Sequence, residues 1–323
     1  MPSLLVLYDG EKVETRNLPG RLRGLAWDQK GSPLAESSLT LVGNAGRMLR
    51  IEIKDVKDHA SLATATPSVR PVSVNLRSVS INPIDNTALI VGNAGTVIAS
   101  KPDGVLAKMY APSSENLRAA SWNWDGRTAL IAGNNGALLH YTEHGLEPIS
   151  GGRANMRGIS WRKNMREALI TSNCFAEEFI PSPNLFLFDA VKNTLNPVSE
   201  GRSDLIGVDW NPDGNLAAVV GYDVVWHTGF IGTFDGSNLS PLPFQWTQVY
   251  PTAVSWDPTG RTAAIATCVA QPHSGQGRII LWNGETFREI YRNEDFFFTS
   301  IAWSPVGFKL AAIASTEART FDS

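Results

Sequence analysis

The stretch LIVGNAGTVIAS, residues 89–100, has two near copies elsewhere in the chain. One copy is LTLVGNAGRMLRIE at 39–52, and the other is ALIAGNNGALLHYTE at 129–143. Each consists of an apolar run, the pattern Gly-Asn-x-Gly and a second apolar run. Because self-similarity at a regular spacing is the sequence signature of repeat architectures, the first hypothesis is a repeat fold.

A second motif recurs in step with the first and extends the repeat over the whole chain. Six of its copies end in Trp and the remaining one ends in Ile81. The seven copies are LRGLAW (22–27), LRSVSI (76–81), LRAASW (117–122), MRGISW (156–161), LIGVDW (205–210), PTAVSW (251–256) and FTSIAW (298–303). Most continue into a turn such as NPDG (211–214) and then into another short apolar run, as two antiparallel strands do.

The spacing of this motif predicts the fold class. Its last residues are 54, 41, 39, 49, 46 and 47 residues apart, which leaves room for four short strands in each unit. Seven such units predict an all-β, seven-bladed β-propeller with four antiparallel strands per blade. Within the motif, large residues such as Leu25 and Trp27 alternate with small ones such as Gly24 and Ala26. The Trp row is therefore expected in the core, with the small residues facing the neighbouring blade.

These units resemble the WD-repeat propellers. VDWNPDGNLAAVVG (208–221) is similar to the first and second strands of that family, and RIILWNGETFREI (278–290) to the third and fourth. The family's Gly-His pair and most of its Trp-Asp endings are missing, and the Gly-Asn-x-Gly turns look more like those of sialidase-type and photosystem-assembly propellers. The resemblance implies a fold and not a function.

The two ends of the chain are expected to meet in one blade. The last motif is followed by too few residues for four strands, whereas SLLVLYDGEKVETR (3–16) matches a third-and-fourth-strand hairpin. We therefore expect a single domain over 1–323, in which 1–16 and 298–323 form the closing blade and leave no exposed strand edge. The polar stretch 54–73 is expected to be a loop insertion in blade 1.

Composition restricts the functional classes. The 323 residues are 43% hydrophobic and 18% charged, with a net charge of −3, which argues against disorder and against a general nucleic-acid binder. The N-terminus has no signal-peptide pattern, no apolar run is long enough to span a membrane, and the only cysteines are Cys174 and Cys268. A cytoplasmic protein that forms a monomeric ring is the expectation.

The sharpest functional feature is an arginine at the second position of the first four motifs: Arg23, Arg77, Arg118 and Arg157. Because first strands line the channel of a propeller, these side chains are expected at one mouth of it. The corresponding residues of blades 5–7 are Ile206, Thr252 and Thr299. Either each arginine pairs with a local carboxylate or carbonyl, or the four form an arc that binds carboxylate or phosphate.

Other rim positions complete the candidate site. The loops expected on the same rim carry polar and aromatic residues that could contact a partner. These candidates are Asn44, Asn93, Asn134, Trp226, His227, Trp246, Tyr250 and Phe296.

The sequence predicts a non-catalytic scaffold that binds a partner protein or peptide at the loop-rich rim. An acidic partner is the candidate. No catalytic constellation, cofactor fingerprint or metal site is evident. His140 and His144 have the spacing of zinc ligands on a helix, but they fall in a strand hairpin. Two alternatives remain open at this stage: a hydrolase or lyase with an active site on the rim, and a binder of nucleic acid or another polyanion through the arginine arc.

Overall fold

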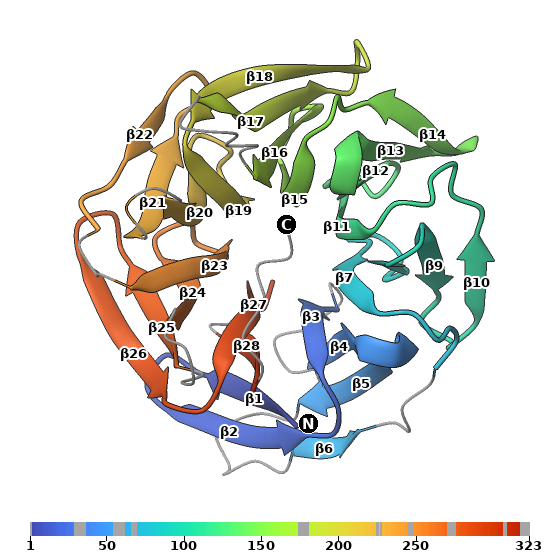
Figure 1. The fold of residues 1–323 in the computed structure, drawn as a ribbon. Coiled ribbons are helices and arrows are strands. Elements are labelled where there is room, and N and C mark those ends of the chain that lie inside the picture. The colour runs from blue at the N-terminus through green and yellow to red at the C-terminus, as the bar shows by residue number, and fades with distance from the viewer. Residues whose placement is uncertain are drawn as a thin grey trace.

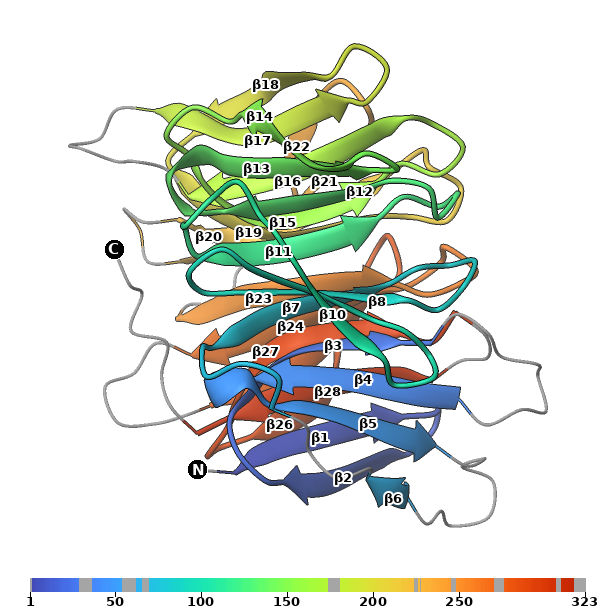
Figure 2. The same cartoon turned by 90° about the vertical axis from the view of Figure 1, so that its right-hand side faces the viewer.

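The chain forms a closed ring of seven four-stranded antiparallel sheets around a central channel, and the prediction of a seven-bladed propeller is confirmed (Figure 1). The structure, a computed structural model, describes residues 2–28, 37–53, 62–65, 70–173, 181–223, 226, 228–244, 248–269, 276–305 and 309–316. Seen from the side, the blades stack around the ring with their turns on two opposite faces (Figure 2). Within the described ranges, no helix is long and apolar enough to cross a membrane.

Each of blades 1–6 consists of four consecutive strands, numbered outward from the channel. Blade 1 contains β3 (Leu22–Trp27), β4 (Ser37–Gly43), β5 (Met48–Ile53) and β6 (Leu62–Ala65). Blade 2 contains β7 (Leu76–Ile81), β8 (Ala88–Gly92), β9 (Thr96–Ser100) and β10 (Leu106–Met109). Blade 3 contains β11 (Leu117–Trp122), β12 (Ala129–Gly133), β13 (Ala137–Thr142) and β14 (Gly145–Ser150). Short 3-10 turns, η1 (Asn44–Gly46) and η3 (Asn134–Gly136), follow β4 and β12.

The second half of the ring repeats this arrangement. Blade 4 contains β15 (Asn155–Trp161), β16 (Glu167–Asn173), β17 (Ser182–Asp189) and β18 (Thr194–Gly201). Blade 5 contains β19 (Ser203–Trp210), β20 (Ala217–Asp223), β21 (Thr228–Phe234) and β22 (Leu239–Pro241). Blade 6 contains β23 (Val249–Trp256), β24 (Ala263–Val269), β25 (Gly277–Trp282) and β26 (Phe287–Asn293).

Blade 7 joins the two ends of the chain, as the sequence predicts. Its strand order is β2-β1-β28-β27, with β1 (Ser3–Tyr8) and β2 (Val13–Leu18) outside β28 (Leu310–Ser315) and β27 (Phe297–Trp303). The register between β1 and β28 is continuous from Ser3↔Ser315 to Tyr8↔Leu310. The N-terminal hairpin therefore completes the last sheet and removes two exposed edges from the ring.

Stretch 54–73 differs from the expected loop insertion. Residues 62–65 form β6, the outer strand of blade 1, which pairs with β5 through Ile53↔Leu62 and Ile51↔Ala65. The apolar pattern of this strand is too short to be recognised in a polar segment, and tertiary pairing decides its conformation. Residues 54–61 and 66–69 lie outside the described part of the chain.

The Trp row lies between blades, as predicted. Trp27, Trp161, Trp210 and Trp256 are buried, while Trp122 and Trp303 are half-buried. Three of the indoles donate a hydrogen bond to a first-strand carbonyl of the preceding blade. These bonds run from Trp27 to Ala302 (2.9 Å), from Trp161 to Ser121 (2.9 Å) and from Trp256 to Asp209 (3.1 Å).

The small residues on the opposite face of the first strand also connect blades. Four hydroxyls and one carboxylate accept a backbone N–H from the first strand of the next blade. The acceptor–donor pairs are Ser78–Ala120 (3.3 Å), Ser80–Trp122 (3.0 Å), Ser160–Trp210 (3.0 Å), Asp209–Trp256 (2.8 Å) and Ser255–Trp303 (3.1 Å). Small size at these positions thus permits a hydrogen bond as well as close packing.

The Gly-Asn-x-Gly motif holds each of blades 1–3 to the next. In blade 1 the Ala45 N–H donates to Asn75 Oδ1 (3.1 Å) and the Gly46 N–H to the Val74 carbonyl (2.6 Å), both in blade 2. A Cβ on Gly46 would lie 1.7 Å from the Val72 carbonyl oxygen, so only glycine fits. Two residues of the motif have left-handed backbone, Ala45 at φ 52° and Gly46 at φ 67°, whereas Asn44 does not. The Asn side chain has another role.

Candidate functional site

Every first strand carries a β-bulge where it approaches one mouth of the channel. In β11 the pairing with β12 jumps from Leu117 to Ala119 and leaves Arg118 without a partner residue. The same jump occurs in the other six blades. The seven bulged residues are Arg23, Arg77, Arg118, Arg157, Ile206, Thr252 and Thr299. Because a bulge locally re-aims a side chain, all seven residues turn toward the channel.

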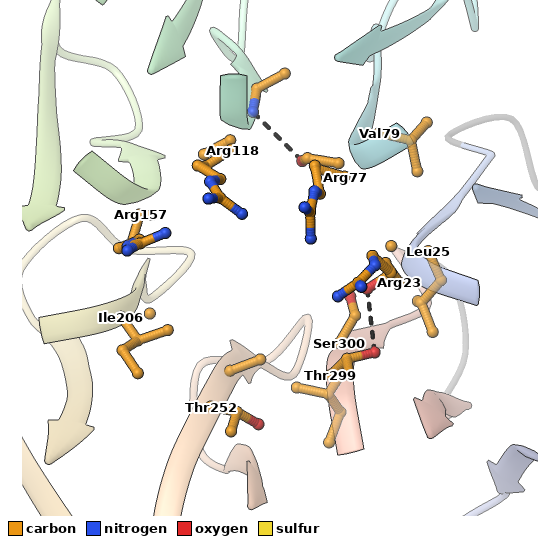
Figure 3. A pocket seen from close by; sticks show the side chains of 18 of the residues that line it. Arg23, Leu25, Arg77, Val79, Arg118, Arg157, Ile206, Thr252, Thr299 and Ser300 are labelled. Carbon is orange, nitrogen blue, oxygen red and sulfur yellow. Dashed lines mark hydrogen bonds between the residues drawn. The ribbon is translucent and has the colours of Figure 1, made fainter. Parts of the chain in front are cut away.

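These residues surround a cavity of about 840 Å³ at that end of the channel. Four guanidinium groups point into it from one side, and Ile206, Thr252 and Thr299 line the other side (Figure 3). We call this end, defined by Arg23, Arg77, Arg118 and Arg157, the arginine mouth. The prediction that the four arginines share one mouth is confirmed.

An asparagine of the same blade orients each arginine of the mouth. The Nε–H donates to the Oδ1 of the residue that directly follows the second strand or ends it. The four pairs are Arg23–Asn44 (2.7 Å), Arg77–Asn93 (2.9 Å), Arg118–Asn134 (3.1 Å) and Arg157–Asn173 (3.0 Å). A bond at Nε fixes the plane of the guanidinium group, whose two terminal nitrogens extend beyond it toward the cavity.

The arginine and the asparagine occur together or not at all. Blades 5, 6 and 7 lack the arginine, and the position of the asparagine is occupied there by Tyr222, Cys268 and Ser315. The threonine hydroxyls of blades 6 and 7 bond to backbone carbonyls, with Thr252 at 2.9 Å from Phe298 and Thr299 at 3.2 Å from Arg23. One side of the mouth is thus cationic, and the other is neutral.

The described side chains that line the mouth are predominantly cationic. The described residues that line the cavity include five arginines, Arg21 being the fifth, and neither aspartate nor glutamate. Close by, the Tyr222 hydroxyl donates to the carboxylate of Asp204, which is buried beneath the neutral side. An arrangement of several oriented guanidinium groups around one cavity suits ligands with two or more negative charges.

The remaining rim candidates have different environments. Trp226 is 75% exposed, and its backbone N–H bonds to Asp223 Oδ1 (2.8 Å). Tyr250 is only 5% exposed and packs edge-on against Tyr222, so it is a core residue rather than a contact residue, and burial raises its pKa. Phe296 is half-buried and packs on the core between blades 6 and 7. His227 and Trp246 lie outside the described residues.

Sequence reasoning missed Asn173, because blade 4 has Ser-Asn-Cys instead of Gly-Asn-x-Gly. A usable signal was present: in blades 2, 3 and 4 the asparagine follows its arginine by 16 residues. It also missed Tyr222, which lines the mouth in place of an asparagine. Among the described residues, no group of three or more His, Cys, Asp or Glu side chains could hold a metal ion.

Comparison with known proteins shows the fold alone. No family model matches the sequence, and no curated protein matches it either. Among solved structures, a chain of Kuenenia stuttgartiensis hydrazine synthase is similar with a TM-score of 0.67 and 14% identity, over 88% of this chain and 90% of that chain. The β-propeller domain of Myceliophteria thermophila Cps50 (Swd1) is similar with a TM-score of 0.63 and 13% identity, over 93% and 98%. The chain thus has a WD-like seven-bladed fold.

Proposed function

We propose that this propeller is a non-catalytic scaffold that binds an acidic segment of a partner protein at the arginine mouth. The single observation that carries the proposal is the convergence of four guanidinium groups, each oriented by its own asparagine, on one cavity. Arginine presents a planar set of donors that matches carboxylates in pairs of hydrogen bonds. An acidic peptide brings several carboxylates to neighbouring positions and so can contact several arginines at once.

The neutral half of the mouth supports a peptide ligand. Ile206 and Tyr222 offer apolar surface opposite the arginines, on which the side chains between the acidic residues can pack. Trp226, exposed beyond the same end of blade 5, adds a large aromatic surface of the kind enriched in protein interfaces. Charge on one side and apolar surface on the other favour one orientation of the bound segment.

The test compares partner recovery with and without the arginine pair at the centre of the arc. The tagged protein, the double variant Arg77→Gln/Arg118→Gln and the control Lys12→Gln/Arg261→Gln are purified from the native cell, and the associated proteins are quantified by mass spectrometry. The control removes the same charge from exposed turns on the other face. We expect at least one co-purified protein whose amount, relative to the wild type, falls about tenfold or more with Arg77→Gln/Arg118→Gln and is unchanged with the control.

Acidic segments of the recovered protein are then titrated as synthetic peptides. We expect binding that weakens as salt concentration rises, because the contact is between charges. Equal recovery of every protein with the two double variants contradicts the proposal. Nucleic acid recovered in place of protein also contradicts it and moves the site to the polyanion-binding alternative.

A further inference from the structure

Exposed apolar side chains gather on the face of the ring opposite the arginine mouth. Seven large apolar side chains are exposed in the described part of the chain, and five of them lie in turns of this face, all in blades 2, 3 and 4. They are Ile84, Val105, Trp124, Met165 and Val191. The equivalent inner turns of blades 5 and 6 read Pro-Asp-Gly (212–214) and Pro-Thr-Gly (258–260) instead. Among the described residues of this face, the exposed apolar side chains therefore lie in one sector of the ring.

Three of these residues form one surface, which we call the turn patch: Ile84, Trp124 and Met165. Ile84 lies against the next turn, since a Cβ on Gly126 would be 2.7 Å from its Cγ1. The Trp124 indole N–H donates to the Met165 carbonyl in the following blade (3.2 Å). The side chain of Asn82 also bonds to the Gly126 carbonyl (2.8 Å). These cross-blade bonds hold the turns together, so the patch is organised before any partner binds.

The turns that carry the turn patch hold one more cation than acid, with Arg127, Arg162, Lys163 and Arg166 against Asp85, Asp125 and Glu167. Arg127, Lys163 and Arg166 are exposed on these turns, and among the described residues none of the three forms an ion pair. Each of the three acids has a partner within its own turn: Glu167 pairs with Arg162 (3.4 Å), Asp85 accepts the Thr87 N–H (2.8 Å) and Asp125 accepts that of Arg127 (2.9 Å). The cations thus remain available to a ligand that also covers the apolar side chains.

We propose that the turn patch docks an amphipathic segment of a partner protein that carries acidic residues beside large apolar ones. Its apolar side chains cover Ile84, Trp124 and Met165, and its carboxylates meet the three cations. Tryptophan and arginine next to each other are the residue types on which interface energy concentrates. The turn patch and the arginine mouth lie at opposite ends of the first strands, so one ring can hold two segments at once. This assignment does not depend on the function proposed for the arginine mouth.

The test uses a display library of short random peptides, panned on the immobilised full-length protein. We expect selected peptides rich in Asp or Glu and in large apolar residues, whose affinity falls at least about tenfold in Trp124→Ser and in Lys163→Glu/Arg166→Glu. Tyr110→Ser is the matched control, since it removes a more exposed aromatic ring on the side of the arginine mouth. Arg77→Gln/Arg118→Gln should leave these peptides bound, which separates this proposal from the one for the mouth.

Several outcomes would overturn the assignment. Selected peptides that lack acidic residues, or that bind the turn variants as well as the wild type, contradict it. A library that yields no peptide dependent on Trp124 does the same. Light scattering adds a further outcome: a dimer of the wild type that becomes monomeric in Trp124→Ser would mean that the occupant is a second copy of this chain. Unchanged melting of the turn variants verifies that they fold.

Discussion

Replacement of Asp209 by Asn should stabilise the ring above pH 6 and remove a pH dependence from its stability. Asp209 occupies the next-to-last position of β19, where blades 2, 3, 4 and 6 have serines. Its carboxylate accepts the Trp256 N–H (2.8 Å) and the Ser160 hydroxyl (3.0 Å). Burial nevertheless raises its pKa from 3.8 to about 6, so desolvation outweighs the two hydrogen bonds.

The size of the effect follows from the two pKa values. An unfolded chain loses this proton near pH 3.8, whereas the folded protein keeps it to about pH 6. Below pH 3.8 Asp209 is protonated in both states and does not lower the free energy of unfolding. As pH rises from 3.8 to 6 the free energy of unfolding falls, and above pH 6 the full cost of the buried charge is present. A difference of about 2.2 pH units corresponds to ~3 kcal/mol. Asp209 keeps some exposed surface, and Asn would reverse the direction of the hydrogen bond with Ser160. We therefore expect Asp209→Asn to raise the free energy of unfolding above pH 6 by about 1–3 kcal/mol.

Thermal unfolding of both proteins from pH 4 to pH 8 measures this prediction. With an unfolding entropy of about 2.1 cal/mol/K per residue, 3 kcal/mol corresponds to a rise in Tm of roughly 4 °C for Asp209→Asn at pH 7.5. The difference between the two curves should vanish near pH 4. His140, whose pKa is lowered by burial, destabilises the fold as pH falls below 6.5, but it does so in both proteins and cancels. The reasoning is refuted if the difference is constant with pH, or if Asp213→Asn, in an exposed turn, has the same effect.

Two further predictions concern the ring and its mouth. Deletion of residues 1–18 removes β1 and β2 and exposes the edge of β28. Gel filtration should then show aggregates, and the cooperative melting transition should be lost. A monomer that melts within a few degrees of the wild type would contradict the closure of the ring by the N-terminal hairpin. Asn134→Ala removes the acceptor of the Arg118 Nε–H and should lower the free energy of unfolding by about 1 kcal/mol or less. In a titration, the affinity of the arginine mouth for an acidic peptide should fall several-fold. Unchanged affinity would show that the orienting bond is unimportant.

The architecture was predictable because each blade repeats the same physical problem. Every first strand must place a large side chain in the core and a small one against the next blade, so the alternation in LRGLAW or LIGVDW recurs around the ring, with Ala120 of LRAASW as an exception. The closing hairpin was recognisable for the same reason, since it resembles the hairpins of other blades. The strand β6 was not, because it is recognised by its pairing with β5, and that pairing leaves little trace in a polar sequence.

The candidate site was predictable in position but not in detail. Equal placement within the motif was enough to bring four arginines to one mouth, since equivalent residues of successive blades point the same way. The bulge that aims Arg118 and the bond that orients it both depend on the pairing of two strands, which a sequence does not state at single-residue precision. Tyr250 and Phe296 were assigned to loops expected on the rim, but Tyr250 is buried against Tyr222 and Phe296 is half-buried against the core of blades 6 and 7.

The joint occurrence of arginine and asparagine bears on why the mouth is charged. Duplication of an ancestral blade could by itself leave arginines at equivalent positions, but it would not keep the orienting asparagine in blade 4, where the surrounding Gly-Asn-x-Gly pattern has changed to Ser-Asn-Cys. In blades 5–7 both residues are replaced, and Ile206 lines the cavity beside Tyr222. An arginine needed only for solubility requires no fixed plane, whereas one that grips a carboxylate does, because both hydrogen bonds must align with it. The pairing is therefore the feature on which the proposed binding of an acidic segment depends, and Ile206 and Tyr222 give the other side of the mouth its apolar surface.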